Sequence, residues 1–184
     1  LAVLRDDESL AELRRSGLFT EAVAGADTAI LQQAVADMEL PWPSEEMRTK
    51  FESFEKPVAV CISAQSPIAD LAGFGRWMDR ELEQDEQLNF VMIPMNPKTD
   101  YNLMRKVQQE MKYHARTLLT DFVEPEEVQN LVGRCKVVIS SRLHLMILGL
   151  NKLVPVIGIA RGSKISTFLN KFNLPTCGST AEID

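Results

Sequence analysis

Residues 136–149, KVVISSRLHLMILG, decide the fold of this 184-residue chain. The apolar run Lys136–Ile139 is typical of a short buried strand, and the longer apolar run from Leu143 is typical of a helix. Ser140 or Ser141 is expected to cap that helix, because a serine oxygen accepts a hydrogen bond from a free amide at a helix start. The stretch therefore predicts a buried strand that turns directly into a helix.

Two basic residues, Arg142 and His144, fall in the first turn of the predicted helix. A helix start already carries about half a positive charge, so a cation there is unfavourable unless a negative group lies nearby. Free amides, a guanidinium and an imidazole together suit a phosphate or a carboxylate. We expect both side chains to point into an open cleft and to bind an anion there. The alternatives are a buried structural role for His144 and an ion pair of Arg142 with Asp121, Glu126 or Glu127.

The composition is that of a globular domain, with 45% apolar and 25% charged residues. A net charge of -6 and a pI of about 5.1 argue against a general affinity for nucleic acid or an anionic membrane. Without a long apolar run or a signal-peptide pattern, the chain is expected to be cytoplasmic. Cys61, Cys135 and Cys177 are widely spaced, which favours reduced thiols and indicates neither a disulfide framework nor a metal site.

From residue 56 onward, short Val/Ile-rich runs alternate with longer amphipathic stretches. This alternation predicts an α/β fold, a Rossmann-like, mostly parallel sheet with helices on both faces. The predicted strands are Pro57–Ile62, Leu88–Ile93, Arg116–Thr120, Lys136–Ile139 and Val154–Ile159. The predicted helices are Leu71–Leu82, Tyr101–Tyr113, Pro125–Gly133, Arg142–Leu150 and Lys164–Phe172. Strands that are apolar throughout are expected to be buried on both faces.

Residues 57–184 are predicted to form this Rossmann-like domain, and residues 41–56 a linker or an exposed helix. Residues 1–40 are expected to be the tail of, or the link from, a missing N-terminal domain, because the chain opens at Leu1 on what looks like a strand entered midway. Within that segment the pattern predicts a strand, a turn and a short capped helix that ends at Gly17.

Residues 158–164, GIARGSK, repeat the arrangement of the earlier stretch. Arg161 and Lys164 flank Ser163, a serine able to cap, at a second strand-to-helix turn. Ligands bind outside the carboxyl ends of the strands in a parallel sheet, and two such turns together favour an anion site. The alternative for Lys164 is an exposed surface lysine, and for Glu126 an ordinary first-turn helix former.

Residues 125–175 carry Arg142-Leu143-His144, then Val154–Ile159 (VPVIGI), and less specific matches at Glu126, Lys164 and Phe168-Leu169. In these residues the chain resembles the C-terminal half of the polysaccharide pyruvyl transferases. Residues 5–9, RDDES, are similar to the segment that closes the family's N-terminal half, after which an Asp-containing strand is expected at Asp27–Leu31.

The resemblance implies a GT-B-like fold of two halves, with the active site between them, of which this chain would supply the C-terminal half. It implies a transferase that moves the enolpyruvyl unit of phosphoenolpyruvate, its donor substrate, onto a sugar of a cell-surface polysaccharide or its precursor. The product is a pyruvate ketal, as in exopolysaccharide and cell-wall biosynthesis. No cofactor and no metal are expected, and this chain alone is expected to be inactive. A lipid-linked acceptor would bring the protein to the inner membrane.

The resemblance also suggests roles for named residues. Arg142 and Lys164, with the helix-start amides, would bind the donor's phosphate and carboxylate, and Ser163 and Arg161 belong to the same site. His144 is the candidate acid that protonates the donor's methylene carbon. Glu126 would orient or activate a sugar hydroxyl.

One position departs from the family pattern. Gln65 follows the first strand of the domain, where family members often carry an arginine, so it can donate hydrogen bonds but brings no charge. Two other functions stay open. One is a sugar-nucleotide-dependent GT-B-type glycosyltransferase, with Arg142 and Lys164 on the diphosphate and the Glu126 region on the ribose. The other is a non-catalytic relative.

Overall fold

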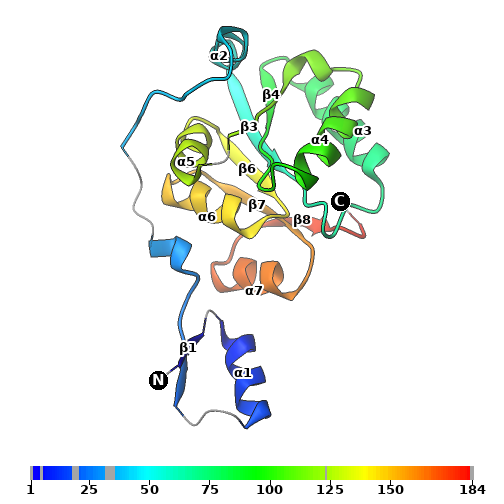
Figure 1. Ribbon diagram of the computed structural model, residues 1–184. Coiled ribbons are helices and arrows are strands. Elements are labelled where there is room, and N and C mark those ends of the chain that lie inside the picture. Colours follow the sequence, from blue (N-terminus) through cyan, green and yellow to red (C-terminus); the bar gives the residue numbers. More distant parts are fainter. Residues whose placement is uncertain (1, 5, 18–20, 32–35, 123, 183–184) are drawn as a thin grey trace. The chain divides into compact units, whose positions relative to one another are not determined.

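The computed structural model describes residues 2–4, 6–17, 21–31, 36–122 and 124–182. The chain forms two compact units, residues 1–33 and residues 34–184 (Figure 1). In the described residues no helix is long and apolar enough to cross a membrane.

The first unit is a small strand–helix–strand arrangement. Strand β1 (Ala2–Leu4) pairs in parallel with β2 (Ala22–Ala24), and helix α1 (Asp7–Ser16) connects them. The Asp6 side chain accepts a hydrogen bond from the Ser9 amide, and Gly17 ends α1 in the left-handed conformation at φ 68°. The predicted strand, turn and capped helix are confirmed.

The prediction of a strand at Asp27–Leu31 is wrong. Residues Thr28–Leu31 form a 3₁₀ turn, η1. The Asp27 carboxylate accepts a hydrogen bond from the Ala29 amide at 3.1 Å, and this local bond favours a turn over an extended strand.

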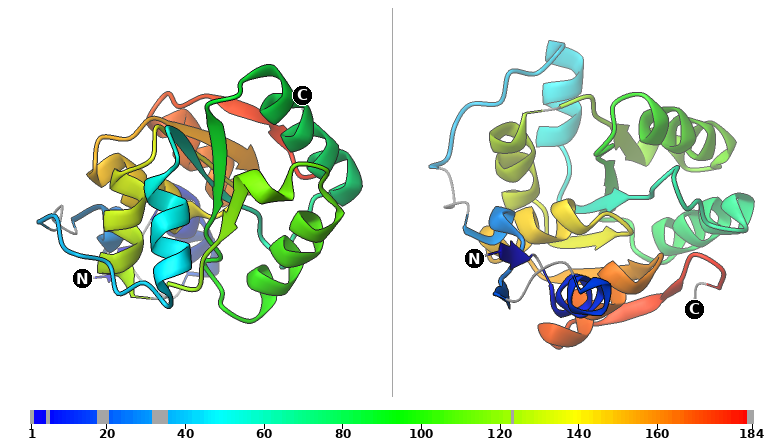
Figure 2. Two further views of the ribbon diagram at one scale, coloured as in Figure 1. Left: turned by 90° about the horizontal axis from the view of Figure 1, so that it is seen from above. Right: turned by 60° about the horizontal axis from the view of Figure 1, so that its bottom comes forward.

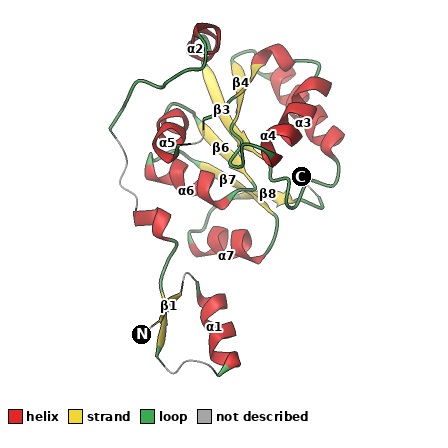
Figure 3. Cartoon of the chain, viewed as in Figure 1, coloured by secondary structure: helices red, strands yellow, loops and turns green. Residues whose placement is uncertain are grey.

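The second unit is built on one six-stranded parallel sheet, ordered β5-β4-β3-β6-β7-β8 (Figure 3). Its strands are β3 (Lys56–Cys61), β4 (Leu88–Met92), β5 (Thr117–Leu119), β6 (Val137–Ser140), β7 (Val156–Ala160) and β8 (Thr176–Ser179). The chain builds β3, β4 and β5 outward in one direction, then crosses to the other side of β3 for β6, β7 and β8. The order therefore reverses between β3 and β6, as in doubly wound nucleotide-binding folds.

Helices cover both faces of this sheet, as the two views in Figure 2 show. They are α2 (Glu45–Glu52), α3 (Leu71–Gln84), α4 (Thr99–Glu110), α5 (Pro125–Gly133), α6 (Leu143–Asn151) and α7 (Ser163–Lys171), with a 3₁₀ turn η2 at His114–Arg116. Helices α3 and α4 lie on one face, and α5, α6 and α7 on the other. The predicted Rossmann-like α/β architecture is confirmed.

The core lies where the sequence is apolar throughout. The side chains of Val58–Cys61 in β3 and of Phe90–Met92 in β4 are buried, because helices pack on both sides of these central strands. Helix α6 is buried along Leu145–Gly149, and Gly149 lets it approach β6 so closely that an added Cβ would lie 2.8 Å from Val138 Cγ2.

The structure decides one alternative that the sequence left open, and it adds one strand. The stretch 41–56, for which a linker or an exposed helix stayed open, contains α2, whose Phe51 is 6% exposed and packs on Trp42 with ring centroids 5.2 Å apart. Strand β8 was not predicted, because Thr-Cys-Gly-Ser has no apolar run. As an edge strand it follows Pro175, whose carbonyl accepts from the Gly158 amide.

Candidate functional site

Polar side chains meet at the carboxyl ends of β3 and β6, where the strand order reverses. Ser63 and Gln65 follow β3, and Arg142 follows β6. Asp100 comes from the first turn of α4 and Arg161 follows β7. We call these five residues the switch-point cluster, because crevices at such reversals are the usual ligand sites of parallel sheets.

Arg142 forms a two-pronged ion pair with Asp100. Its Nε donates to Oδ2 at 2.8 Å and its Nη2 to Oδ1 at 2.7 Å, while Nη1 donates to Gln65 Oε1 at 3.2 Å. The Arg142 side chain is 15% exposed and that of Asp100 is fully buried. The expectation of a guanidinium waiting in an open cleft is therefore wrong. An ion pair is present, but its partner is Asp100 and none of the acidic residues that the sequence suggested.

Asp100 ties three strand-end loops together. Besides Arg142 after β6, its Oδ1 accepts from the Ala64 amide after β3 at 2.9 Å, and its Oδ2 accepts from the Asn96 amide after β4 at 3.1 Å. Asp100 lies in the first turn of α4, where the helix dipole attracts a negative charge. Sequence reasoning missed Asp100, because an acidic residue at a helix start looks like an ordinary helix former. The available signal was its place in the turn after a buried strand.

Ser63 also connects these strand-end loops through hydrogen bonds. It is 1% exposed, its amide donates to Ser141 Oγ at 2.8 Å, and its own Oγ accepts from the Gln65 amide at 3.2 Å. Ser63 Oγ also accepts from Arg161 Nη1 at 3.3 Å, which brings the turn after β7 to the turn after β3.

Arg161 is the second guanidinium of the cluster. Its Nε is buried and has no hydrogen-bond partner in the part of the chain that the structure describes, an arrangement that costs about 1–3 kcal/mol for a polar group. Burial, and then the positive charge of Arg142, lower the pKa of Arg161, while Asp100 acts in the opposite direction. The cluster thus contains two guanidinium groups but one carboxylate, which is hydrogen-bonded to Arg142, and this imbalance suits an anionic ligand.

The predicted helix caps at these two turns are wrong. Arg142 is itself the N-cap of α6, and Gly162 is the N-cap of α7, in both cases without a side-chain capping bond. Ser140 Oγ accepts from the Arg142 amide at 2.9 Å and donates to its carbonyl at 3.0 Å, so this serine fixes the turn before the helix begins. Ser163 is the first residue of α7 and is exposed.

The remaining predicted site residues lie at helix starts on the same edge of the sheet. His144 is exposed in the first turn of α6, Lys164 is exposed in the first turn of α7, and Glu126 is exposed in the first turn of α5. The hydrogen bonds found among the described residues unite Gln65, Arg142 and Arg161 with Asp100 and Ser63. They do not bring Lys164, Ser163 or Glu126 into the cluster.

The thiol of Cys61, close to the cluster, is unsuited to nucleophilic chemistry. Cys61, the last residue of β3, is fully buried, and burial raises its pKa to about 12. The thiol therefore stays protonated at neutral pH. Within the residues that the structure describes, no group of three His, Cys, Asp or Glu side chains is placed to hold a metal ion.

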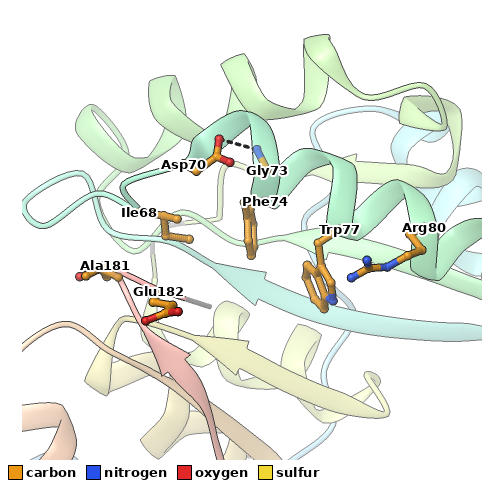
Figure 4. Close-up of a pocket in the computed structure, with 9 residues that line it drawn as sticks. Ile68, Asp70, Gly73, Phe74, Trp77, Arg80, Ala181 and Glu182 are labelled. Atoms are coloured by element: carbon orange, nitrogen blue, oxygen red, sulfur yellow. Dashed lines mark hydrogen bonds between the residues drawn. The ribbon is translucent and has the colours of Figure 1, made fainter. Parts of the chain in front are cut away.

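A separate cavity of about 320 Å³ lies between α3 and the segment that follows β8. Figure 4 shows Phe74 and Trp77 projecting from α3, with Ala181 and Glu182 on the segment that follows β8; all four residues line the cavity. The two rings stack with centroids 5.3 Å apart. The residues that line this cavity include none of the switch-point cluster.

Solved structures of GT-B-type enzymes share this fold. MnaA of S. aureus, solved with UDP, has a TM-score of 0.66 and 16% identity, with 95% of this chain and 47% of that chain covered. UDP-GlcNAc 2-epimerase of Methanocaldococcus jannaschii, solved with UDP-GlcNAc and UDP, has a TM-score of 0.63 and 13% identity, with 95% and 49% covered. ADP-heptose LPS heptosyltransferase II of E. coli has a TM-score of 0.51 and 13% identity, with 68% and 41% covered.

At these identities the likeness concerns the fold, and the chain spans less than half the length of each of these structures. No curated protein matches the chain. The model of one family, described as polysaccharide pyruvyl transferase, matches residues 1–163, which include the whole switch-point cluster and the Arg-Leu-His motif. The chain belongs to the polysaccharide pyruvyl transferase family.

Proposed function

We propose that the protein transfers the enolpyruvyl unit of phosphoenolpyruvate to two hydroxyls of a saccharide, forming a pyruvate ketal. The observation that carries this proposal is the excess of positive charge in the switch-point cluster, which contains the guanidinium groups of Arg142 and Arg161 and one carboxylate, that of Asp100. Phosphoenolpyruvate carries both a phosphate and a carboxylate, so a cationic crevice at helix starts suits it.

The reaction needs one acid and one leaving group. A proton adds to the donor's methylene carbon, and the neighbouring carbon becomes electrophilic. One sugar hydroxyl oxygen bonds to that carbon, a second hydroxyl oxygen follows, and the carbon–oxygen bond to phosphate breaks. The two hydroxyl protons balance the proton taken up by carbon and the proton carried off by phosphate.

Residues at the starts of α5, α6 and α7 supply the groups that these steps need. His144 is exposed at the start of α6, two residues after the Arg142 cap, and we assign it the role of the acid. Lys164 and Ser163 at the start of α7 extend the cationic and polar edge toward the donor. Glu126 at the start of α5 is the proposed partner of a sugar hydroxyl.

The competing function is glycosyl transfer from a sugar nucleotide. It is favoured by the shared fold, since two of the neighbouring structures were solved with UDP. In that case the same cations would meet a diphosphate.

A binding and turnover experiment on the full-length protein separates the two functions. We expect phosphoenolpyruvate to bind, and phosphate to be released when a saccharide acceptor is added. Binding of UDP-N-acetylglucosamine without binding of phosphoenolpyruvate would reject pyruvyl transfer in favour of the alternative. Lipid-linked sugars should be included among the acceptors, with inorganic phosphate as the measured product.

A further inference from the structure

The two arginines of the switch-point cluster are engaged differently. The edge of the Arg142 guanidinium formed by Nε and Nη2 is occupied by Asp100, and Nη1 is bonded to Gln65. All three nitrogens of Arg142 therefore already donate to protein oxygens. A ligand that bound the Arg142 guanidinium would break its ion pair with Asp100 and leave that buried carboxylate without its cation.

Arg161 has the corresponding edge without such a partner. Its Nη1 donates to Ser63 Oγ, whereas its Nε is buried with no acceptor among the described residues. The Nε and Nη2 edge is the one through which Arg142 holds the two oxygens of Asp100. The same geometry in Arg161 suits two oxygens of a carboxylate or a phosphate.

The electrostatics agree with this geometry. Burial, and then the positive charge of Arg142, lower the pKa of Arg161, while Asp100 acts in the opposite direction. The Asp100 carboxylate already accepts four hydrogen bonds, two from Arg142 and two from loop amides. In the described part of the chain, Arg161 is therefore the cation of the cluster that forms no hydrogen bond with a carboxylate. The side chain as a whole is half-buried, so part of it faces solvent.

We infer that Arg161 is the principal anion-binding residue of this crevice, and that Arg142, held by Asp100, is a positioning residue that keeps the strand-end loops and Arg161 in place. The ligand class is an organic phosphate or carboxylate with two oxygens on one centre. The assignment builds on the proposed function, in which this anion is phosphoenolpyruvate, and it names the residue that holds it.

The test uses calorimetric titration of the full-length protein with three probes: phosphoenolpyruvate, inorganic phosphate and UDP-N-acetylglucosamine. Arg161→Met removes the charge, and Arg161→Lys keeps the charge but loses the two-pronged edge. Lys171→Met is the matched control, because Lys171 is an exposed cation in the last turn of α7, at the opposite end of that helix from the site. We expect Arg161→Met to weaken phosphoenolpyruvate binding about 10- to 100-fold and Arg161→Lys by a smaller factor, because hydrogen bonds to charged groups are the strong ones. Lys171→Met should change affinity less than about threefold, because its charge is exposed and screened by salt.

Five outcomes decide between this assignment and its alternatives. Unchanged affinity in both Arg161 variants would overturn the assignment, and so would an equal loss of affinity in Lys171→Met. A wild-type protein that binds none of the probes would also overturn it. If UDP-N-acetylglucosamine binds in place of phosphoenolpyruvate and Arg161→Met weakens it, Arg161 keeps its assignment while pyruvyl transfer fails. If Arg161→Met does not fold, Arg161→Lys decides alone, since it keeps the charge.

Discussion

Arg142 holds the buried carboxylate of Asp100 through two parallel hydrogen bonds of 2.8 and 2.7 Å, across 42 residues of sequence. The carboxylate has no exposure to solvent, and the same two oxygens accept two loop amides. This pair therefore acts on the stability of the fold as well as on the site.

Arg142→Met is expected to destabilise the protein by about 3–5 kcal/mol, because it leaves a buried carboxylate without its cation. The free energy of unfolding from urea titration measures the change. The matched control is Arg76→Met, since Arg76 pairs with Asp70 at 3.2 Å with both side chains about 70% exposed (70% and 68%). That variant should change stability little. Equal effects of the two substitutions would mean that the Asp100 pair is not buried in solution.

His144→Ala should lower turnover by about 10²- to 10⁴-fold if the imidazole is the general acid. Because His144 is exposed on α6, the melting temperature of the His144→Ala variant should stay close to that of the wild type. His114→Ala is the control, since His114 is also exposed and lies in η2, where its ring contacts the Met111 carbonyl. A pH profile of kcat that stays unchanged in His144→Gln would argue against the acid role.

Gly149→Ala should destabilise the protein by about 1–3 kcal/mol through overpacking, because the new Cβ would approach Val138 Cγ2 at 2.8 Å. Gly75→Ala is the matched control in a helix. Its Cβ would meet nothing closer than 3.7 Å, so the gain in helix propensity should leave stability unchanged or higher. Thermal unfolding of both variants checks the prediction, and a stabilised Gly149→Ala would contradict the close packing of α6 on β6.

Stability should fall as pH rises from about 9 toward 12. Burial raises the pKa of both Cys61 and Cys135 from 9.0 to about 12, so above pH 9 the unfolded chain loses thiol protons that the folded chain retains. The stabilisation is complete below pH 9 and is lost on approach to the folded-state pKa. Melting temperatures between pH 8 and 10.5 measure this slope.

The double variant Cys61→Ala/Cys135→Ala serves as the reference for that measurement, because lysine and tyrosine titration is common to both proteins. Its melting temperature should fall less steeply with pH than that of the wild type. Parallel slopes would show that the two thiols are not protected from ionisation.

The sequence by itself determined the local elements of this protein. Apolar runs at Val58–Cys61 and Phe90–Met92 specify buried strands, Gly17 ends α1 because it adopts a positive φ, and Pro125 begins α5 because its missing amide is not needed there. These features depend on residues that are neighbours along the chain, so a local pattern contains them. The sequence also singled out Gln65, Arg142 and Arg161, which the structure brings into one cluster.

Only the tertiary structure decided which partners these side chains have. Asp100 lies 42 residues from Arg142, and Ser63 lies 98 residues from Arg161. They meet because the sheet places β3 beside β6 and β6 beside β7, and no local pattern encodes that order. A cation at a helix start looks the same in sequence whether a ligand or a distant carboxylate neutralises it, since electrostatic energy depends on distance in space and on burial. The strand order therefore decided that Arg142 is neutralised within the protein.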